Sequence, residues 1–483
     1  MREKIKGMLF GIVSSSIISV ISALLLYFAY DMGLLTVKRL VFAVGVFLII
    51  SLSVFWVGAD IKKRSRKIIA IILSALILVL QVLGGYYLLI GRSALKDITN
   101  PQTEYTEISV FVMKEDKATK VEDIKDYKLG ILEVQDRAAT NYALNVIELM
   151  IGKSEVFAYT GIEELVDALL EGKVEAIVLN RSFLDLLDEN SNYTDINDKI
   201  RLIYSLQCET AVNDDEDVTV KNKNVFTVYI SGIDCTGSIS RRSRSDVNIL
   251  ATINLETGQI LLLSTPRDYY VPLSISKGIP DKLTHAGIYG IDVSVDTLEM
   301  LYDIDIDYYF RVNFDGFKEI IDALGGITVH SDFDFTWGTH SFKKGENYLN
   351  GEQALTFART RKVFSGGDRQ RGEHQMEVIR AVINKMSDPV IITNYKEILD
   401  GLKGAFETSV PYKKITYVIQ NFVKGGTEWK VTSFSVNGTG KYDKPYSLSA
   451  NAYVMVPDYN TVEQAKELMR QVRDGKIVQL PAD

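Results

Sequence analysis

Three long apolar runs fill most of the first hundred residues. They cover residues 7–30, 40–59 and 68–90, and none carries a charged side chain in its interior. As a helix, each run is long enough to cross about 30 Å of hydrocarbon. A cleaved signal peptide or a buried helical hairpin is the alternative, but three successive runs favour insertion into a membrane. The sequence therefore predicts an anchor of three transmembrane helices over residues 1–97.

The distribution of basic side chains predicts how this anchor is oriented. Basic residues cluster before the first run, at positions 2–6, and between the second and third runs, at positions 62–67. Loops rich in Lys and Arg remain in the cytoplasm. Two basic residues at positions 38–39, between the first and second runs, reduce the difference in basic charge between the two sides of the membrane but do not reverse it. With three spans, everything after Arg92 is then extracytoplasmic, and the chain is expected to be a multi-pass protein of the cell membrane.

The charge of the chain changes after the anchor. Residues 1–97 contain 12 of the 54 Lys and Arg residues but only 4 of the 62 Asp and Glu residues, which leaves 42 basic and 58 acidic side chains beyond them. Proteins bind nucleic acid by neutralising its phosphates across a basic face. The acidic exterior therefore argues against nucleic acid as a partner.

Two cysteines, Cys208 and Cys235, follow the anchor. An oxidising exterior permits a disulfide between them, and two free thiols are the alternative. Their spacing does not decide between these two states.

The residues after the anchor exceed one average domain, so two soluble domains are expected. In the first, residues 98–212, short apolar strands alternate with helical segments, which is typical of a small α/β sheet domain. No convergent set of polar side chains occurs in it, and this favours an accessory or docking module over a small-molecule site. The predicted strands cover residues 108–113, 128–132, 156–159, 174–179 and 200–204, and the predicted helices cover residues 136–151, 162–171 and 181–188.

A polar, acidic stretch without apolar periodicity, residues 213–224, is expected to be a linker. The second soluble domain covers residues 225–483. Strands predicted at residues 225–230, 247–254 and 259–264 alternate with helices, which indicates a layered α/β/α domain. The predicted fold class is α/β, with three N-terminal transmembrane helices, a small α/β accessory domain and a layered α/β/α catalytic domain.

Two motifs with charged side chains lie at strand ends. Arg244 and Asp246 begin a predicted strand, and regular alternation places both side chains on one face. Arg267 and Asp268 directly follow another apolar strand, where α/β sheets tend to bind ligands. For either motif alone, a surface salt bridge or an ordinary turn is the alternative.

Two further motifs lie at helix ends. Residues 350–353 have the pattern of a capping box, and the short helix that they begin ends near Arg359, so Arg359 and Arg361 are in position to hold one phosphate group together. Asp368 is the predicted N-cap of a longer helix that reaches about residue 386. Arg371 and Gln375, four residues apart, share one face of its first turns. A helix N-terminus also favours an anion.

These motifs together predict a site for a phosphorylated ligand. Guanidinium groups pair bidentately with phosphate, so convergent arginines suit a polyanion such as pyrophosphate. Carboxylates beside phosphate oxygens form the oxygen shell that Mg2+ prefers. Apolar residues at helical spacing nearby, in segments 291–302 and 317–324, fit ordinary core packing and equally a tunnel for a lipid tail. The arginines are Arg244, Arg267, Arg359, Arg361 and Arg371, and the carboxylates are Asp246, Asp268 and Asp368.

The order of these motifs resembles the LytR-CpsA-Psr family of bacterial cell-envelope proteins. The anchor and the small domain resemble the capsule-associated streptococcal branch of that family. The resemblance extends from the first span to the C-terminus, and its specific part lies between Gly232 and Gln375. The motifs are Gly232-x-Asp234, Arg244-x-Asp246, Pro266-Arg-Asp268, Leu349-Asn-Gly-Glu-Gln-Ala-Leu355, Arg359-x-Arg361 and Asp368-x-x-Arg371-x-x-x-Gln375.

The resemblance implies a Mg2+-dependent phosphotransferase of the Gram-positive envelope. It would move a glycopolymer from polyprenyl pyrophosphate onto peptidoglycan at the outer face of the membrane, with capsular polysaccharide expected and teichoic acid as an alternative. Other capsule-assembly proteins would be its partners. A polyprenyl-pyrophosphate phosphatase, which uses water as the acceptor, is a competing function. A non-catalytic binding or regulatory protein is another, although the predicted topology leaves only short basic loops in the cytoplasm.

The resemblance also implies roles for individual residues. Asp234 and Asp246 would hold Mg2+ or Mn2+. Asp246, Arg244 and Arg267 would act in catalysis, and Asp246, Asp268 and Asp368 are the candidates for a general base. The pyrophosphate would be bound by Arg244, Arg267, Arg359, Arg361, Arg371 and Gln375.

Overall fold

The structure of the protein is a computed structural model that describes residues 2–59, 64–99, 104–133, 136–187, 190, 192–209, 224–233, 238–361, 363–364, 367–386, 404–424 and 429–480. These residues form two compact units. The first unit contains the N-terminal helices together with residues 410–424, and the second contains the remaining described residues.

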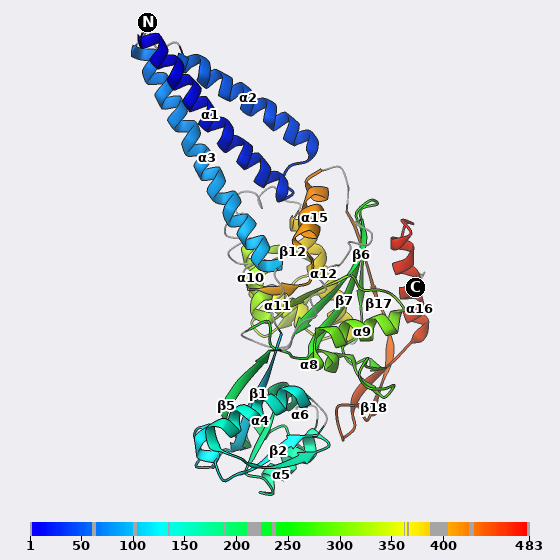
Figure 1. The fold of residues 1–483 in the computed structure, drawn as a ribbon. Helices are drawn as coiled ribbons and strands as arrows, with labels where there is room; N and C mark the ends of the chain where they lie inside the picture. Colours follow the sequence, from blue (N-terminus) through cyan, green and yellow to red (C-terminus); the bar gives the residue numbers. More distant parts are fainter. Residues whose placement is uncertain are drawn as a thin grey trace. The chain divides into compact units, whose positions relative to one another are not determined.

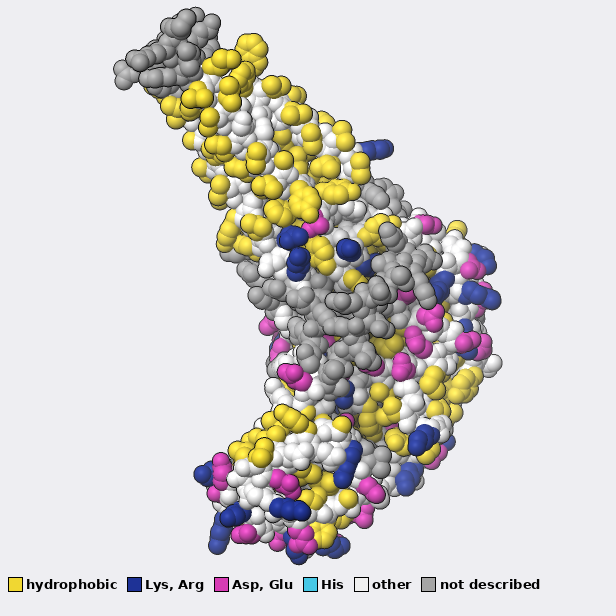
Figure 2. Space-filling model, viewed as in Figure 1, with side chains coloured by type: hydrophobic (Ala, Val, Ile, Leu, Met, Phe, Trp, Pro, Cys, Tyr) yellow, Lys and Arg dark blue, Asp and Glu magenta, His cyan; other side chains and the backbone are white. Residues whose placement is uncertain are grey.

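The first unit contains the three helices predicted for the anchor. They are α1 (Arg2–Asp31), α2 (Val37–Ala59) and α3 (Arg64–Thr99). Each is long and apolar enough to cross a membrane, over Met8–Asp31, Val37–Gly58 and Ile68–Lys96. Apolar side chains cover the outer surface of these helices (Figure 2). This composition suits contact with lipid rather than water.

Polar and small residues join the helices of this unit. The side chain of Gln81 in α3 donates a hydrogen bond to Ser22 Oγ of α1 at 2.7 Å. Gly58 of α2 lies so close to α1 that an added Cβ would be 2.9 Å from Gly11 Cα. The short helix α15 (Tyr412–Lys424) packs with these helices, and the Tyr412 hydroxyl donates to Asp31 at 3.2 Å. Interhelical hydrogen bonds and small residues are the usual means by which membrane helices associate.

The accessory domain is a five-stranded sheet with the order β3-β2-β4-β1-β5. β2 runs parallel to β3 and β4, and β1 runs antiparallel to β4 and β5. The strands are β1 (Tyr105–Met113), β2 (Lys128–Leu132), β3 (Glu155–Tyr159), β4 (Ala176–Asn180) and β5 (Ile200–Glu209). The helices are η1 (Val121–Ile124), α4 (Arg137–Ile151), α5 (Ile162–Leu170), η2 (Arg181–Phe183), α6 (Leu184–Leu187) and α7 (Ile196–Lys199).

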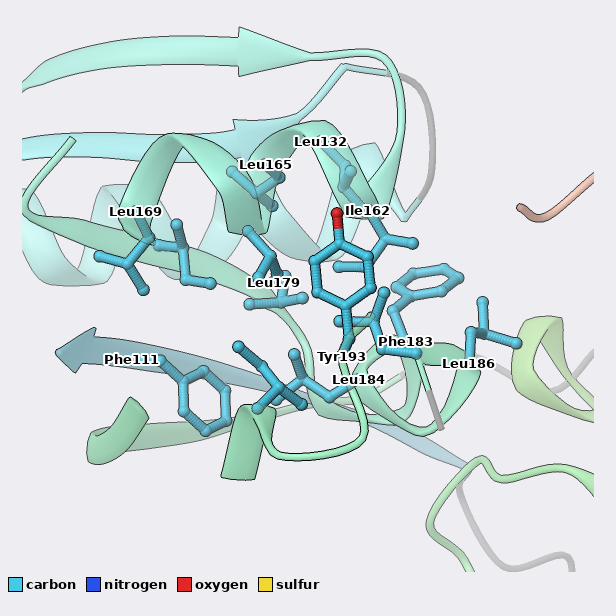
Figure 3. Close-up of a cluster of buried hydrophobic side chains, with 14 of the residues drawn as sticks. Phe111, Leu132, Ile162, Leu165, Leu169, Leu179, Phe183, Leu184, Leu186 and Tyr193 are labelled. Carbon is cyan, nitrogen blue, oxygen red and sulfur yellow. The ribbon is translucent and has the colours of Figure 1, made fainter. Parts of the chain in front are cut away.

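Two apolar clusters make up the core of this domain. One packs α4 against the sheet through residues such as Ala143 and Ile147. The other gathers Leu165 of α5 and Phe183 of η2 (Figure 3). This second cluster also includes Ile288, Leu448 and Ala452 of the catalytic domain. The two domains of this unit therefore share a continuous core.

Cys208 lies in the accessory domain as a buried thiol. Its Sγ donates to the Ala139 carbonyl at 3.6 Å, and burial raises the pKa of the thiol. The structure thus has Cys208 as a free thiol, whereas Cys235 lies outside the described residues.

The catalytic domain is built on a six-stranded sheet with the order β16-β11-β6-β7-β8-β17. Figure 1 labels β6, β7 and β17 of this sheet. β6 is parallel to β11, and β8 is parallel to β17. β7 runs antiparallel between β6 and β8, so the ends of β6 and β8 and the start of β7 meet at one edge. The strands are β6 (Val225–Ile233), β7 (Ser245–Asn254), β8 (Gln259–Ser264), β11 (Tyr308–Val312), β16 (Phe406–Thr408) and β17 (Lys430–Ser435).

Helices cover both faces of this sheet, as the predicted α/β/α layering requires. α9 (Ile291–Tyr302) and α16 (Tyr459–Arg473) share a core with Leu261 and Leu263 of β8. Strand alternation points Ser264 to the other face, where α12 (Asp368–Met386) packs. Two more helices belong to that second layer, and their core is rich in aromatic residues. They are α10 (Phe314–Ala323) and α11 (Gly351–Arg359).

The catalytic domain also contains four short two-stranded sheets and two short helical turns among its described residues. These two-stranded sheets pair β9 (Tyr270–Pro272) with β10 (Pro280–Lys282), β12 (Ile327–Ser331) with β15 (Gly345–Leu349), β13 (Phe335–Trp337) with β14 (His340–Phe342), and β18 (Gly438–Asp443) with β19 (Ala452–Pro457). The turns η3 (Leu283–His285) and α8 (Ala286–Tyr289) follow β10. β10 and η3 bring further polar side chains to the sheet edge that holds the predicted motifs.

Candidate functional site

A β-bulge sets the position of Asp246. Gly232 pairs with Val247, but the next residue of β6, Ile233, pairs with Ser245, so Asp246 is the extra residue in β7. An added Cβ at Gly232 would lie 2.6 Å from Val247, so the pairing here requires glycine. Bulges next to active sites redirect side chains. The regular alternation that predicted a shared face for Arg244 and Asp246 is interrupted at this point.

Buried hydroxyl groups fix the start of β7 behind this bulge. Ser245 is fully buried and lies 2.7 Å from the Ser231 hydroxyl and 2.9 Å from the Tyr229 hydroxyl. Tyr229 also donates to the side chain of Asn248 at 2.7 Å. Because these polar groups satisfy one another, the strand is held firmly where Asp246 leaves it.

Arg267 and Asp246 form the centre of the site. Nη1 of Arg267 lies 2.7 and 2.6 Å from the two carboxylate oxygens of Asp246. The Thr284 hydroxyl donates to the same carboxylate at 3.2 Å. Both ionic side chains are less than one-fifth exposed, which strengthens their interaction relative to a surface pair.

Asp268 lies beside this pair and is bound by a buried lysine. Lys282 Nζ is 2.8 Å from Asp268 Oδ1, and Arg267 Nε is 3.8 Å from Oδ2. Burial by itself would raise the pKa of Asp268, but the charges of Lys282 and Arg267 outweigh it and hold the pKa below the usual value. Asp268 is therefore anionic at neutral pH.

Two more arginines join the cluster from α12 and the segment before it. Arg371 Nη2 lies 3.2 Å and Arg361 Nη1 lies 3.4 Å from Asp368 Oδ1. Burial lowers the pKa of Arg371, and the charges of Arg267 and Arg361 act in the same direction. Like charges held this close favour binding of an anion between them.

The charged cluster therefore contains four cations and three carboxylates at one edge of the sheet. We use this name for Arg267, Lys282, Arg361 and Arg371 with Asp246, Asp268 and Asp368. Three of the predicted arginines and all three predicted carboxylates belong to it. Its position at the ends of β6 and β8 matches the place where α/β sheets bind ligands.

For three other predicted residues, the described contacts involve groups that are not part of the charged cluster. Arg244 donates through Nη1 to the backbone carbonyl of Asp185 at 3.2 Å. The guanidinium of Arg359 lies 4.0 Å from the centre of the Phe314 ring. Gln375 donates to the Ala358 carbonyl at 3.4 Å. Asp234 lies outside the described residues.

Sequence reasoning missed Lys282 and Thr284. They lie two residues apart on β10 and η3, and both point to carboxylates of the charged cluster. Asp281 of β10 pairs with Val271 of β9, and its carboxylate accepts a hydrogen bond from His285 Nδ1 at 2.7 Å. These contacts hold the segment in place. No spacing in the sequence relates Lys282 to Asp268, so only the tertiary pairing identifies it.

Gly372 lets α12 approach the sheet next to Arg371. An added Cβ at Gly372 would lie 2.5 Å from Ser264 Oγ at the end of β8. The close approach brings Arg371 to the sheet edge. His374, one turn along, stacks on Phe357 at 4.2 Å, and burial lowers its pKa to about 4. This histidine is neutral at physiological pH and belongs to the aromatic core.

Comparison with known protein families matches residues 188–471 to the LytR_cpsA_psr family. The chain belongs to the LytR-CpsA-Psr family. The match includes every motif on which the predicted resemblance depended, from Gly232 to Gln375, and confirms it. The charged cluster lies entirely within the matched residues.

Characterised members of the LytR-CpsA-Psr family are similar to this chain. The polyisoprenyl-teichoic acid–peptidoglycan teichoic acid transferase TagU of Bacillus subtilis is 34% identical over 227 residues, 47% of this chain and 72% of TagU. TagU of Oceanobacillus iheyensis is 36% identical over 229 residues, 46% of this chain and 69% of that protein. The crystal structure of TagV of B. subtilis is 32% identical, with a TM-score of 0.45 over 53% of this chain and 99% of TagV.

Proposed function

We propose that the protein is a phosphotransferase that moves a glycopolymer from polyprenyl pyrophosphate to a hydroxyl group of peptidoglycan. The similar TagU proteins are named for such a transfer with teichoic acid. The observation that carries the proposal is the charged cluster, in which Arg267, Arg361 and Arg371 converge with Lys282 around three carboxylates. Four cations at a sheet edge suit the charge of a pyrophosphate group.

The transfer proceeds by displacement at the phosphorus that carries the polymer. The acceptor oxygen forms a new bond to this phosphorus, and the bond from phosphorus to the bridging oxygen breaks. Polyprenyl phosphate leaves with the electron pair of that bond, and the hydroxyl proton passes to a carboxylate. Catalysis of phosphoryl transfer consists mainly of positioning and stabilisation of charge. Arg267, Arg361 and Arg371 supply both through fixed guanidinium groups.

Asp268 is poorly suited to act as the general base. Asp268 is held anionic by Lys282 and Arg267, which lower its pKa and so make it a weaker base. Its role is to orient Lys282. Asp246 and Asp368 remain candidates for accepting the proton.

The remaining proposals follow the family resemblance. The polymer is capsular polysaccharide, with teichoic acid as the alternative, in a Gram-positive cell with other capsule-assembly proteins as partners. The domains after α3 face the outer side of the membrane, where peptidoglycan lies. The basic residues at positions 2–6 and 62–67 support this orientation.

Mg2+ or Mn2+ is the proposed cofactor, held by Asp234 and Asp246. Among the described residues, no group of three or more His, Cys, Asp or Glu side chains is arranged to hold a metal ion. Both oxygens of Asp246 already accept hydrogen bonds from Arg267. Of the two proposed ligands only Asp246 lies in the described part of the chain, and Asp234 and pyrophosphate oxygens would complete the shell. The steps above therefore use only side chains of the protein.

Metal removal tests this cofactor. We expect EDTA to reduce transfer by at least about tenfold and added Mg2+ or Mn2+ to restore it, because neutralisation of pyrophosphate by a divalent ion is worth several kcal/mol. The measurement is the initial rate of transfer at fixed ionic strength, with Ca2+ as a comparison ion. Full activity after removal of divalent ions would contradict the proposed cofactor.

Reconstitution of the full-length protein in proteoliposomes tests the function itself. Lipid-linked glycopolymer and Mg2+ are supplied with and without peptidoglycan, and polyprenyl phosphate and polymer–peptidoglycan phosphodiester are measured. We expect both products in equal amounts, and only when peptidoglycan is present. Release of polyprenyl phosphate at the same rate without peptidoglycan would instead establish a phosphatase. Binding of the lipid without either product would establish a non-catalytic protein.

A further inference from the structure

The hairpin β18–β19 is attached directly to the charged cluster. The backbone N–H of Met455 in β19 donates to the Asp268 carbonyl at 2.7 Å, and Met455 forms a β-bridge with Tyr269. A second attachment joins Tyr446, in the turn of the hairpin, to the Pro280 carbonyl at 3.0 Å. The hairpin is thus held at a defined position beside the site.

This hairpin presents aromatic rings to solvent. Tyr442 is 75% exposed and Tyr453 is 40% exposed, and their ring centroids lie 6.0 Å apart in an edge arrangement. Tyr270 of β9 donates its hydroxyl to the Lys444 carbonyl at 2.7 Å and so lies beside the same hairpin. Adjacent exposed aromatic rings are suited to contact with a ligand.

Tyr453 connects these rings to the charged cluster. Burial raises the pKa of Tyr453, and the charges of Asp268 and Asp368 raise it further while Lys282 and Arg361 oppose them. The Tyr453 ring packs against Gly440, where an added Cβ would lie 2.6 Å from the tyrosine hydroxyl oxygen. The glycine therefore leaves room for the Tyr453 ring against β18.

We propose that Tyr270, Tyr442 and Tyr453 form a subsite for a sugar ring next to the phosphate that reacts. This rests on the proposed function, in which sugars flank that phosphate on both the donor and the acceptor. One face of a pyranose ring consists of C–H groups and matches the face of an aromatic ring, whose burial costs little conformational entropy. Lys441 and Asp443, paired at 2.6 Å on the same strand, offer polar partners for the sugar hydroxyls, and the Lys441 Nζ lies 5.2 Å from the centre of the Tyr270 ring.

Binding measurements on the full-length protein in detergent test the subsite without any transfer reaction. One titration uses a peptidoglycan disaccharide, and the other uses a soluble fragment of the glycopolymer without lipid or pyrophosphate. For Tyr442→Ala we expect the Kd of one of these sugars to rise about tenfold, as expected for loss of one aromatic contact. Tyr442→Phe keeps the ring and should keep the Kd. The sugar that responds identifies the acceptor or the donor side.

The matched control is Tyr142→Ala, since Tyr142 is 55% exposed on α4 of the accessory domain. We expect it to leave both Kd values unchanged. Unchanged binding of both sugars by Tyr442→Ala, or no sugar binding by the wild-type protein, would overturn the subsite. Sugar binding in a protein that transfers nothing would leave the subsite standing and overturn the proposed function.

An independent set of contacts joins the accessory domain to the segment that leads into β7. The N–H of Tyr105 in β1 donates to the Ser240 carbonyl at 3.2 Å. The Ser182 hydroxyl of η2 donates to the Arg242 carbonyl at 2.6 Å. Two residues later, Arg244 donates to the Asp185 carbonyl of α6 at 3.2 Å.

Side chains reinforce this attachment. Arg242 Nε donates to Glu104 at 3.2 Å, and its Nη1 lies 3.9 Å from Asp136 of the accessory domain. On the other side of the segment, Gly287 of α8 packs so closely that an added Cβ would lie 2.5 Å from the Ser243 carbonyl oxygen. The neighbouring Ile288 belongs to the apolar core of the accessory domain.

We infer that the accessory domain positions the segment before the bulge at Asp246 and, with it, Arg244, which the family resemblance assigns to the pyrophosphate site. The domain fixes the backbone of the segment before the bulge and holds the guanidinium through the Asp185 carbonyl. It is thus part of the scaffold of the site, in addition to the docking role that the sequence favoured. Positioning of a catalytic group by a neighbouring element is worth a measurable part of the rate.

A double-mutant cycle tests this role in the transfer assay. We expect Ser182→Ala to lower kcat about tenfold with KM for the lipid substrate unchanged, and to have no further effect on kcat in an Arg244→Ala background. The control Thr119→Ala removes a hydroxyl that bonds Asp123 at 3.1 Å on the accessory domain surface. Unchanged kcat in Ser182→Ala, or additive effects of the two substitutions, would overturn the inference. Absence of transfer by the wild-type protein would instead reject the proposed function.

Discussion

Replacement of Arg267 by alanine is expected to lower kcat for glycopolymer transfer by about 100- to 1000-fold, the usual effect of removing one preorganised donor from a site of developing charge. Arg267 contacts both oxygens of Asp246 and also approaches Asp268. Without it, the substrate pyrophosphate would meet two carboxylates with less compensating charge. The measurement is the single-turnover rate in the reconstituted assay.

Two further substitutions make this prediction specific. Arg267→Lys should recover only part of the rate, because an ammonium group lacks the planar fork that binds phosphate and carboxylate together. Arg369→Ala is the matched control, because Arg369 is 59% exposed on α12 and pairs with Glu373 at 3.2 Å on the surface. It should leave kcat within about twofold of the wild-type value. A wild-type rate for Arg267→Ala would contradict the assignment of the charged cluster as the reaction centre.

Local chemistry explains why parts of the site were predictable from the sequence. The capping box at residues 350–353 is present, with Gln353 N–H donating to Asn350 at 2.9 Å and Asn350 N–H donating to Gln353 at 3.1 Å. Arg267 follows a fully buried strand, and such strand ends lie at the ligand edge of an α/β sheet. In both cases the spacing of residues along a single helix or strand was sufficient for the prediction.

The rest of the site depends on pairings between distant segments. The bulge at Asp246 arises from the register between β6 and β7, and Lys282 meets Asp268 through a separate hairpin. The contact of Arg244 with the Asp185 carbonyl joins two domains that the sequence divides by a linker. A sequence motif specifies which residue types are available. Which residues they contact is determined by the register of the sheet and by the packing of one domain against another.

Replacement of the buried Arg311 is expected to have the largest effect on the free energy of unfolding. It is the largest fully buried side chain among the described residues, and its guanidinium lies between Glu104 and Glu407. Nη2 is 2.6 Å from Glu407, which also accepts a hydrogen bond from the Tyr309 hydroxyl at 2.9 Å. Burial would lower the pKa of Arg311, but the two glutamates outweigh it and raise the pKa. The arginine is charged, and both of its terminal nitrogens are paired with carboxylates.

Arg311→Met is expected to reduce the free energy of unfolding by about 3–5 kcal/mol, because it leaves buried carboxylates without their counter-charge. Thermal unfolding in detergent, with the heat-inactivated fraction measured alongside, reports the loss. Arg470→Ala is the matched control, since Arg470 pairs with Glu467 on the surface with 69% of its side chain exposed. Its effect should stay within about 0.5 kcal/mol. An Arg311→Met protein as stable as the control would contradict the structural role of the buried network.

The pH dependence of the variant distinguishes an unpaired charge from a simple packing defect. Burial already raises the pKa of Glu407 in the intact network, and Arg311 opposes that rise. Without Arg311 the pKa of Glu407 in the folded state should rise further above its unfolded value. A carboxyl group whose pKa is higher in the folded than in the unfolded state stabilises the fold while it is protonated. This contribution to the free energy of unfolding is lost as the pH rises through the folded-state pKa. The stability deficit of Arg311→Met should therefore shrink as the pH is lowered from neutrality toward the ordinary glutamate range.

A second substitution, Glu407→Gln, tests the same explanation. The double variant Arg311→Met, Glu407→Gln should recover part of the stability deficit at neutral pH, because a neutral amide at this position needs no counter-charge. A deficit that is constant with pH and unaffected by Glu407→Gln would mean that shape, rather than charge, governs the stability of this part of the sheet.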